Sequence, residues 1–102
     1  MEKEIIWSNP AKTDLQNIYE FNIQIRGEEK AFELIKKIME VASLLESKTI
    51  GSTKYVSDIH PEIDYQKLIW SHYLIIFRFE SDDLIYINRV FDSRQNPSKL
   101  SL

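Results

Sequence analysis

Apolar, β-branched and aromatic residues gather into three runs in the last third of the chain, at residues 67–70, 73–79 and 84–91. Runs of this composition are typical of strands on a pleated, partly buried surface. The polar gaps between them, at 71–72 and 80–83, are so short that neighbouring strands must be antiparallel. The pattern therefore predicts that the chain ends in a three-stranded meander with a polar tail after it.

The middle run carries apolar residues on both of its faces. A two-residue turn at 71–72 gives one shared face, which we interpret as the core and which comprises Leu68, Trp70, Tyr73, Ile75 and Phe77. The opposite face carries an apolar strip made by Leu74 and Ile76. We expect this strip to need a cover of its own, either the tail around Leu100 and Leu102 or an amphipathic segment of another protein.

The register of the last strand stays open at this point. A four-residue turn at 80–83 puts the even-numbered residues 84, 86 and 88 on the core side, whereas one more loop residue puts Ile85 and Ile87 there. We favour the second register, because it buries two isoleucines and exposes Asn88. A bulge near Arg89 is compatible with both halves of the strand.

The first half of the chain predicts one strand and two helices. Residues 5–7 form a short apolar run between polar neighbours, which fits a strand. Asn9 and Pro10 mark a helix start, with Asn9 as the cap and Pro10 in the first turn, where its missing N–H has no partner anyway. Gly27 ends this helix, whose apolar stripe comprises Ala11, Leu15, Ile18, Tyr19 and Ile25.

A second helix is predicted over residues 28–45, with Glu28 and Glu29 at the positive end of its dipole. The short link at 24–27 makes the two helices an antiparallel hairpin. Both helices need an apolar surface to pack against, and the strands supply it. The stripe of the second helix comprises Ala31, Leu34, Ile35, Ile38, Ala42 and Leu45.

These elements predict an α+β fold: an N-terminal strand, then an α-helical hairpin packed on one face of a small antiparallel sheet that ends in the three-stranded meander. We expect the first strand at an edge of the sheet or beside the last strand. Residues 47–64 form a loop with one short strand at 54–57. The length of the chain and the lack of an internal boundary indicate a single domain over residues 1–102.

Composition excludes several classes of site. The 102 residues include no cysteine, which excludes disulfides and thiolate zinc sites, and only two glycines, too few for a glycine-rich phosphate loop. The formal net charge is −3. General nucleic-acid binders carry an excess of basic residues for phosphate contact, and this composition does not have one. His60 and His72 stand outside any metal or triad pattern, and Asp82-Asp83 fits a solvated turn. We therefore expect no catalytic, metal or cofactor site, no membrane span and a cytoplasmic location.

The end of the chain is locally basic, although the whole chain is acidic. Beyond residue 84, Arg89, Arg94 and Lys99 face a single acid, Asp92. One interpretation is an ordinary exposed edge with internal ion pairs, such as Arg89 with Asp92 or Glu80. The other is a docking surface for an acidic partner. The charge pattern alone leaves both open.

In the order and spacing of these features the chain resembles the RelE/ParE superfamily of type II toxin–antitoxin toxins. The ending resembles the ParE branch, where the last strand runs into an arginine-bearing tail. The resemblance covers most of the chain except the 47–64 loop, and no single motif in it is specific. The residues that carry it are Ile5-Ile6-Trp7-Ser8, Ala11, Asp14-Leu15, Ile18-Tyr19, Lys67-Leu68, His72 to Phe77, Ile87, Arg89-Val90 and Asp92 to Leu100.

The resemblance implies a toxin of a plasmid-stabilisation system that a cognate antitoxin holds inactive by wrapping it with an extended, partly disordered segment. ParE-like members inhibit DNA gyrase, and RelE-like members cleave messenger RNA at the ribosome. The resemblance therefore points to antitoxin contact at Leu74 and Ile76. It also points to contact with the target at the end of the chain, through Arg89, Asp92, Arg94 and Lys99.

Departures from the RelE pattern favour the ParE-like interpretation. The arginine that follows the central-strand tyrosine in RelE-like nucleases is replaced by Leu74, and Asp92 stands where some members have a histidine. Leu74 supplies neither a base nor a cation for RNA cleavage. We therefore favour a non-catalytic inhibitor that makes no direct sequence-specific contact with DNA.

Two alternatives remain beside the gyrase inhibitor. One is a RelE-like, ribosome-dependent endonuclease, in which Lys67, Arg78 and Tyr86 contact RNA. The other is a non-toxic protein-binding module with the same fold.

Overall fold

The computed structural model describes residues 3–47, 53–57 and 59–94. Its fold is the predicted α+β arrangement, with a helical hairpin and a closing meander. The elements, in chain order, are β1 (Glu4–Trp7), α1 (Asn9–Arg26), α2 (Glu28–Ser43), the 3₁₀ turn η1 (Leu44–Ser47), β2 (Thr53–Tyr55), β3 (Tyr65–Trp70), β4 (Tyr73–Ser81) and β5 (Leu84–Asp92).

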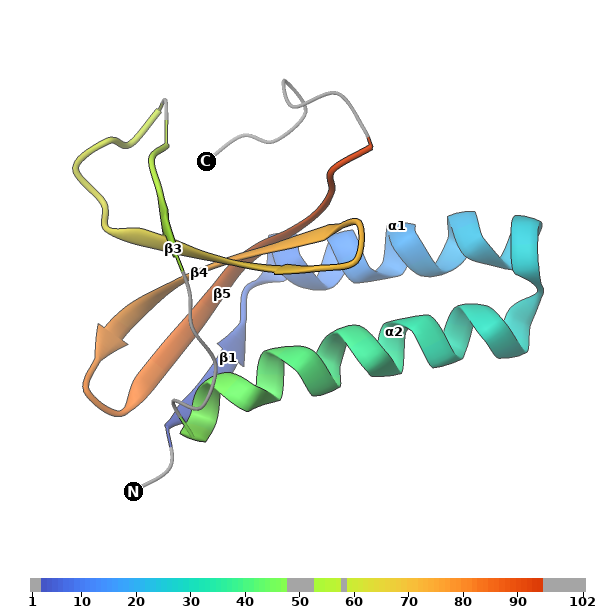
Figure 1. The fold of residues 1–102 in the computed structure, drawn as a ribbon, viewed down its shortest axis with the longest axis horizontal. Coiled ribbons are helices and arrows are strands. Elements are labelled where there is room, and N and C mark those ends of the chain that lie inside the picture. Colours follow the sequence, from blue (N-terminus) through green and yellow to red (C-terminus); the bar gives the residue numbers. More distant parts are fainter. Residues whose placement is uncertain (1–2, 48–52, 58, 95–102) are drawn as a thin grey trace.

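The strands form one five-stranded sheet in the order β1-β5-β4-β3-β2, and the two helices lie side by side along one of its faces (Figure 1). β1 lies at the edge beside β5, where the sequence placed it. The two strands run parallel, so the sheet is mixed and only its other pairs are antiparallel. No helix in the described part of the chain is long and apolar enough to span a membrane.

Ser8, and not Asn9, caps α1. The Ser8 hydroxyl oxygen accepts the Ala11 amide at 3.1 Å, while Asn9 and Pro10 are already the first residues of the helix. The same hydroxyl donates to the Asn88 carbonyl at 2.8 Å, and the Ser8 amide donates to the Ile87 carbonyl at 3.0 Å. One small side chain therefore ends β1, starts α1 and ties both to β5.

Gly27 joins the two helices. Its φ of 88° and ψ of 164° lie in a region that only glycine occupies without strain. Its amide donates to the Ile23 carbonyl and its carbonyl accepts the Ala31 amide, so this residue closes α1 and opens α2. α2 ends at Ser43, two residues before the predicted end, and continues as the 3₁₀ turn.

The hairpin between β3 and β4 has the predicted register. Trp70 pairs with Tyr73 and Leu68 with Ile75, and Ser71 takes a positive φ of 55° in the two-residue turn. Both strands extend slightly beyond the predicted runs, since β3 begins at residue 65 and β4 ends at residue 81. The short strand predicted at 54–57 lies instead at 53–55, because only these residues pair with β3.

Two irregularities set the register between β4 and β5. Ile76 pairs with Arg89 but Phe77 pairs with Ile87, so Asn88 is an extra residue in β5; Glu80 is a similar extra residue in β4. Ile85 and Ile87 consequently face the helices and are fully buried, as the favoured register predicted. The prediction that Asn88 is exposed is wrong: only 9% of it is accessible, because the bulge turns it against its neighbours.

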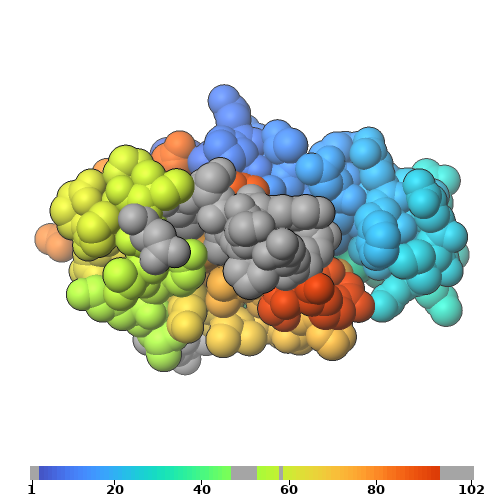
Figure 2. All heavy atoms as spheres, turned by 90° about the horizontal axis from the view of Figure 1, so that it is seen from above, coloured from blue at the N-terminus to red at the C-terminus, as the bar shows by residue number. Residues whose placement is uncertain are grey.

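The core lies between the helices and the inner face of the sheet. It is assembled from residues of both helices and from the inner residues of β3, β4 and β5. The predicted stripe of α1 is only partly correct, because Ile25 is 63% exposed and Tyr19 lies outside this cluster. The buried members of the core are Ala11, Leu15, Ile18, Ile38, Val41, Ala42, Leu45, Leu68, Tyr73, Ile75, Phe77, Ile85, Ile87 and Val90. The turn that joins α1 and α2 projects beyond the strands at one end of the molecule (Figures 1 and 2).

Candidate partner-binding site

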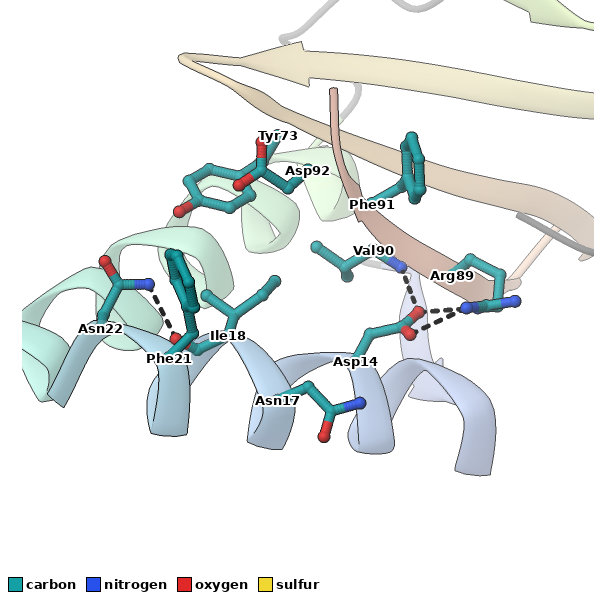
Figure 3. A pocket seen from close by; sticks show the side chains of 10 residues that line it. All are labelled: Asp14, Asn17, Ile18, Phe21, Asn22, Tyr73, Arg89, Val90, Phe91 and Asp92. Atoms are coloured by element: carbon teal, nitrogen blue, oxygen red, sulfur yellow. Dashed lines mark hydrogen bonds and ion pairs between the residues drawn. The ribbon is translucent and has the colours of Figure 1, made fainter. Parts of the chain in front are cut away.

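A cleft of about 410 Å³ lies between α1 and the second half of β5. β1 pairs with β5 only as far as Ile87, where the chain leaves the sheet and enters α1. Beyond that point α1 lies beside β5 in place of a strand, and the space between them is the cleft. Its lining residues, drawn in Figure 3, are Asp14, Asn17, Ile18, Phe21, Asn22, Tyr73, Arg89, Val90, Phe91 and Asp92.

Asp14 and Arg89 form a two-pronged ion pair on one side of the cleft. The Arg89 Nε donates to Asp14 Oδ2 at 2.7 Å and its Nη2 donates to Oδ1 at 2.9 Å. Only 18% of the arginine side chain and 12% of the aspartate side chain are exposed. The hydrogen bond that Arg89 donates to Asp14 raises the pKa of Arg89 and outweighs the opposing effect of burial, so the guanidinium stays charged.

Asp14 also accepts a backbone hydrogen bond from β5 beyond the point where β1 ends. The Val90 amide donates to Asp14 Oδ2 at 2.9 Å, at the position where a strand neighbour would otherwise accept it. Figure 3 shows the carboxylate between this amide and the guanidinium of Arg89. A single carboxylate therefore fixes both the backbone and the arginine of β5 against α1.

A second ion pair stands at the end of β5. The Arg94 Nε and Nη2 donate to the two carboxylate oxygens of Asp92 at 3.0 and 2.7 Å, and the Arg94 amide donates to Oδ1 at 2.9 Å. Asp92 is 9% exposed, whereas 48% of the Arg94 side chain is open to solvent. The hydrogen bond from Arg94 lowers the pKa of Asp92 despite its burial, and the positive charge that His72 can carry acts in the same direction.

The floor of the cleft is more apolar and includes one buried amide. Asn22 is 2% exposed and its Nδ2 donates to the Ile18 carbonyl at 2.7 Å. Ile18, Phe21 and Val90 line the cleft around it, and Phe21 is half exposed.

The predicted RNA-contact residues lie on the outer face of the sheet, away from the helices. The guanidinium of Arg78 stacks on Tyr86, with 4.5 Å from its Cζ to the ring centroid. Arg78 also pairs with Glu80, its Nε donating at 2.8 Å. With its amide turned to satisfy both neighbours, Asn88 accepts from Arg78 Nη1 at 2.8 Å.

Lys67 completes the set, on the neighbouring strand β3, where it pairs with Ile76 of β4. The predicted RNA-contact residues therefore share one face of the sheet, but the charge of Arg78 is already matched within the chain.

The strip predicted to be bare is only partly so. Leu74 is partly exposed, but Ile76 has no exposed surface and Phe91 is 8% exposed. The expectation that Ile76 is open to a partner is therefore wrong, because its side chain has no exposed surface. The exposed apolar neighbour of Leu74 is instead Ile69, at 65%, directly opposite on β3.

The arginines of the last strand find partners other than the predicted ones. Arg89 was expected to pair with Asp92 or Glu80, but it pairs with Asp14, while Asp92 pairs with Arg94 and Glu80 with Arg78. Arg89 and Asp92 still line one cleft, and Arg94 stands at its rim through Asp92. Lys99, Leu100 and Leu102 lie outside the described residues.

Sequence reasoning missed Asp14, although a signal was present. Ala11, Asp14, Leu15 and Ile18 follow the spacing of one helical face, so an acid lies within the buried stripe of α1. A buried acid requires a cation or several hydrogen-bond donors as partners. The pattern could have predicted an ion pair with the sheet, although not which arginine supplies it.

His60 and His72 are both exposed, and neither lines this cleft. His60 lies in the loop before β3 and contacts Glu62 at 3.3 Å, and the His72 carbonyl accepts the Ser93 amide at 2.7 Å in the hairpin turn. Within the described ranges, no group of three or more histidine, aspartate or glutamate side chains is placed to hold a metal ion.

Comparisons with known proteins agree on one family. A family model described as "ParE toxin of type II toxin-antitoxin system, parDE" matches residues 5–97. A solved structure entitled "Chromosomal ParDE TA system from P. aeruginosa" is similar to this chain with a TM-score of 0.66 and 26% identity. The match covers 87% of this chain and 94% of that one. No curated protein matches.

Proposed function

The chain belongs to the ParE family of type II toxin–antitoxin toxins, and from that premise we propose that it blocks DNA gyrase by binding it, and that a cognate antitoxin neutralises it. In this proposal the chain acts in the cytoplasm, as the toxin of a plasmid-stabilisation system. The observation that carries the proposal is the pair of ion pairs along the cleft, Asp14 with Arg89 and Asp92 with Arg94.

These ion pairs support binding and argue against catalysis by the same residues. A general acid or base works best when its pKa lies near the working pH. Arginine lowers the pKa of Asp92, and Asp14 raises that of Arg89, so both groups stay charged at neutral pH. Groups held in one charge state and one orientation suit recognition of a charged protein surface.

Arg94 is the residue of this site best placed to reach a target. Half of its side chain is open, whereas Asp92, Asp14 and Arg89 are largely buried. We therefore propose that Arg94 contacts an acidic patch of gyrase while the buried pairs hold the end of β5 in place. We include Lys99 in the same proposed contact because it follows Arg94 in the basic end of the sequence.

The test is DNA supercoiling by purified gyrase with increasing amounts of the protein. Inhibition is expected for the wild type and is expected to weaken several-fold in Arg94→Ala, because an exposed interfacial charge is lost. Lys37→Ala is a matched control, since Lys37 is an equally exposed cation on α2. Supercoiling that continues unchanged at high molar excess would overturn the proposed target.

The ribonuclease alternative draws on one observation, the stack of Arg78 on Tyr86 beside Lys67. RNA-binding surfaces use aromatic rings and arginine guanidinium groups as platforms on which bases stack, and this face carries one of each. Primer extension on translated messages distinguishes the two functions, since new cleavage ends would favour the nuclease. Normal growth and chromosome segregation after induction would favour the non-toxic binding module instead.

For the antitoxin we propose contact on the outer face of the sheet at Leu74, with Ile69 opposite it as the exposed continuation of the same apolar surface. Ile76 is the next residue of β4 on the same face, but it has no exposed surface and is not part of the proposed contact.

A further inference from the structure

The outward surface of the helical hairpin carries a second apolar area, separate from the cleft and from the outer face of the sheet. Two shallow hollows adjoin there, and every residue that lines them comes from α1 or α2. Both hollows share Tyr19 and Phe32, and 62% of Phe32 is exposed. We call this surface the hairpin face; it comprises Lys12, Leu15, Gln16, Tyr19, Glu28, Glu29, Phe32, Glu33, Ile35 and Lys36.

One hollow of the hairpin face is mainly apolar, and the other is lined by three glutamates and one lysine, Lys36. The first, about 480 Å³, lies among Leu15, Tyr19 and Ile35 with Lys12 at its border. The second, about 650 Å³, is bordered by Glu28 and Glu29 and lies nearer the Gly27 end of the hairpin. The exposed Phe32 stands between the two. An exposed aromatic residue beside an apolar hollow is the usual form of an interface anchor.

The charges of the hairpin face are polarised along its length. Lys12 lies in the first turns of α1, and Glu28 and Glu29 lie at the start of α2, beside the Gly27 turn. Glu33 follows them along α2, and Lys36 lies further from the turn than all three glutamates. Because the helices are antiparallel, the face is basic at one end and acidic at the other. A two-fold axis through the centre of such a face brings the basic end of one copy to the acidic end of the other.

We propose that the hairpin face binds a second copy of this chain. The two hairpins pack face to face about a two-fold axis near Tyr19 and Phe32, which places Phe32 of each copy in the apolar hollow of the other. Lys12 of each copy then lies against Glu28 and Glu29 of its counterpart. The contact is a four-helix arrangement in which each partner supplies the same residues.

Charge complementarity is what selects a second copy as the occupant. An unrelated apolar helix would fill the hollow but leave Lys12 and the paired glutamates without matched partners. The same chain supplies the aromatic anchor, the apolar hollow and both signs of charge in the required order. The pairing also leaves the cleft at β5 open, because the hairpin face shares none of that cleft's lining residues.

The first test is the mass of the purified chain by sedimentation velocity over a hundredfold range of concentration. The wild type is expected to move from monomer to dimer, and Phe32→Asp is expected to stay monomeric, because it puts a charge into the apolar centre. Val56→Asp is the matched control, since Val56 is 63% exposed and lies outside the hairpin. Circular dichroism confirms that each variant keeps its helices.

The second test reverses the charges. Lys12→Glu alone and the double change Glu28→Lys with Glu29→Lys are each expected to weaken the dimer, because like charges then face each other. The triple variant is expected to restore it, since the complementary order is re-established with opposite signs. Weakening without restoration would overturn the two-fold arrangement.

The third test uses the absence of cysteine from the chain. Phe32→Cys is expected to form a disulfide-linked dimer under mild oxidation, because the two copies of this residue lie near the axis, whereas Val56→Cys is not. A wild type that stays monomeric at every concentration, or a Phe32→Asp change that weakens only binding to the antitoxin, would overturn the proposal.

Discussion

At the scale of single residues, Asp14 determines how the cleft is held. Its two oxygens accept from the guanidinium of Arg89 and from the Val90 amide, at the point where β5 no longer pairs with β1. A glutamate would carry the carboxylate one carbon further from the helix, and an asparagine would lose the charge. The residue therefore joins the start of α1 to the end of β5 in a way that backbone pairing no longer can.

Replacing Asp14 by alanine is expected to destabilise the fold by about 2–4 kcal/mol, because the largely buried Arg89 loses its two-pronged ion pair and the Val90 amide loses its acceptor. Asp14→Asn is expected to cost less, since the amide oxygen still accepts from Val90. Urea unfolding measures both changes. Glu40→Ala is the control, because its pair with Lys37 is more than half exposed and contributes under about 1 kcal/mol. Equal effects of Asp14→Ala and Glu40→Ala would contradict this account.

Asp92 makes stability depend on acid pH. The Arg94 guanidinium holds the pKa of Asp92 in the folded protein below its ordinary value of 3.8. Its contribution to stability is therefore complete above pH 4 or so and is lost as pH falls through the lower, folded-state pKa. Comparing the unfolding free energy of the wild type and Asp92→Asn from neutral to strongly acid pH should show a gap that closes only below about pH 4. A gap that stayed constant into strong acid would mean that the ion pair adds nothing.

At the scale of elements, the hairpin depends on the backbone of Gly27. Its positive φ, combined with an extended ψ, lets α1 end and α2 begin within one residue. Gly27→Ala is expected to cost about 1–3 kcal/mol, although a Cβ there would touch nothing within 4 Å, because the penalty lies in the backbone. Thermal unfolding measures this loss of stability. Gln24→Ala is the control, because Gln24 is an exposed residue of α1 close to Gly27. An unchanged melting temperature would show that the turn relaxes freely.

The helices and strands were predictable from the sequence, whereas the way in which some of them pair was not. The apolar period gave both helices, the meander and the pairing of Trp70 with Tyr73, because these are local patterns. A bulge near Arg89 was compatible with both halves of the last strand, and the structure has one there, with Asn88 as the extra residue. The parallel pairing of β1 with β5 was beyond such patterns, because neither strand's sequence records the direction of its neighbour.

The candidate site was predictable only in part, for the same physical reason. The sequence identified Arg89, Asp92 and Arg94 as a charged end, but an ion pair is fixed by which elements meet in space. Arg89 finds its partner 75 residues away in the chain. Burial of Ile76 was missed likewise, because its alternation places it on the outer face without saying what packs there.

At the scale of the whole molecule, the surfaces divide into three. The cleft at the end of β5 is charged and fixed by ion pairs, the outer face of the sheet carries the apolar surface at Leu74 and Ile69, and the hairpin face lies on the helices. A small domain holds only modest stability, so a partner that binds the folded state raises it measurably. Binding on one surface can thus be read from the stability of the whole chain.

Two aspartate substitutions on the outer face should separate partner contact from packing. Leu74→Asp is expected to leave the fold intact and to weaken binding of the cognate antitoxin, since a charge enters an apolar contact. Ile76→Asp is expected to cost more than about 4 kcal/mol, because a charge without a partner replaces a side chain with no exposed surface. Thermal unfolding of each variant, alone and with the antitoxin, distinguishes the two: Leu74→Asp should melt like the wild type when alone but lose the rise in melting temperature that the antitoxin gives. If Leu74→Asp unfolds alone, its side chain belongs to the core and the antitoxin binds elsewhere.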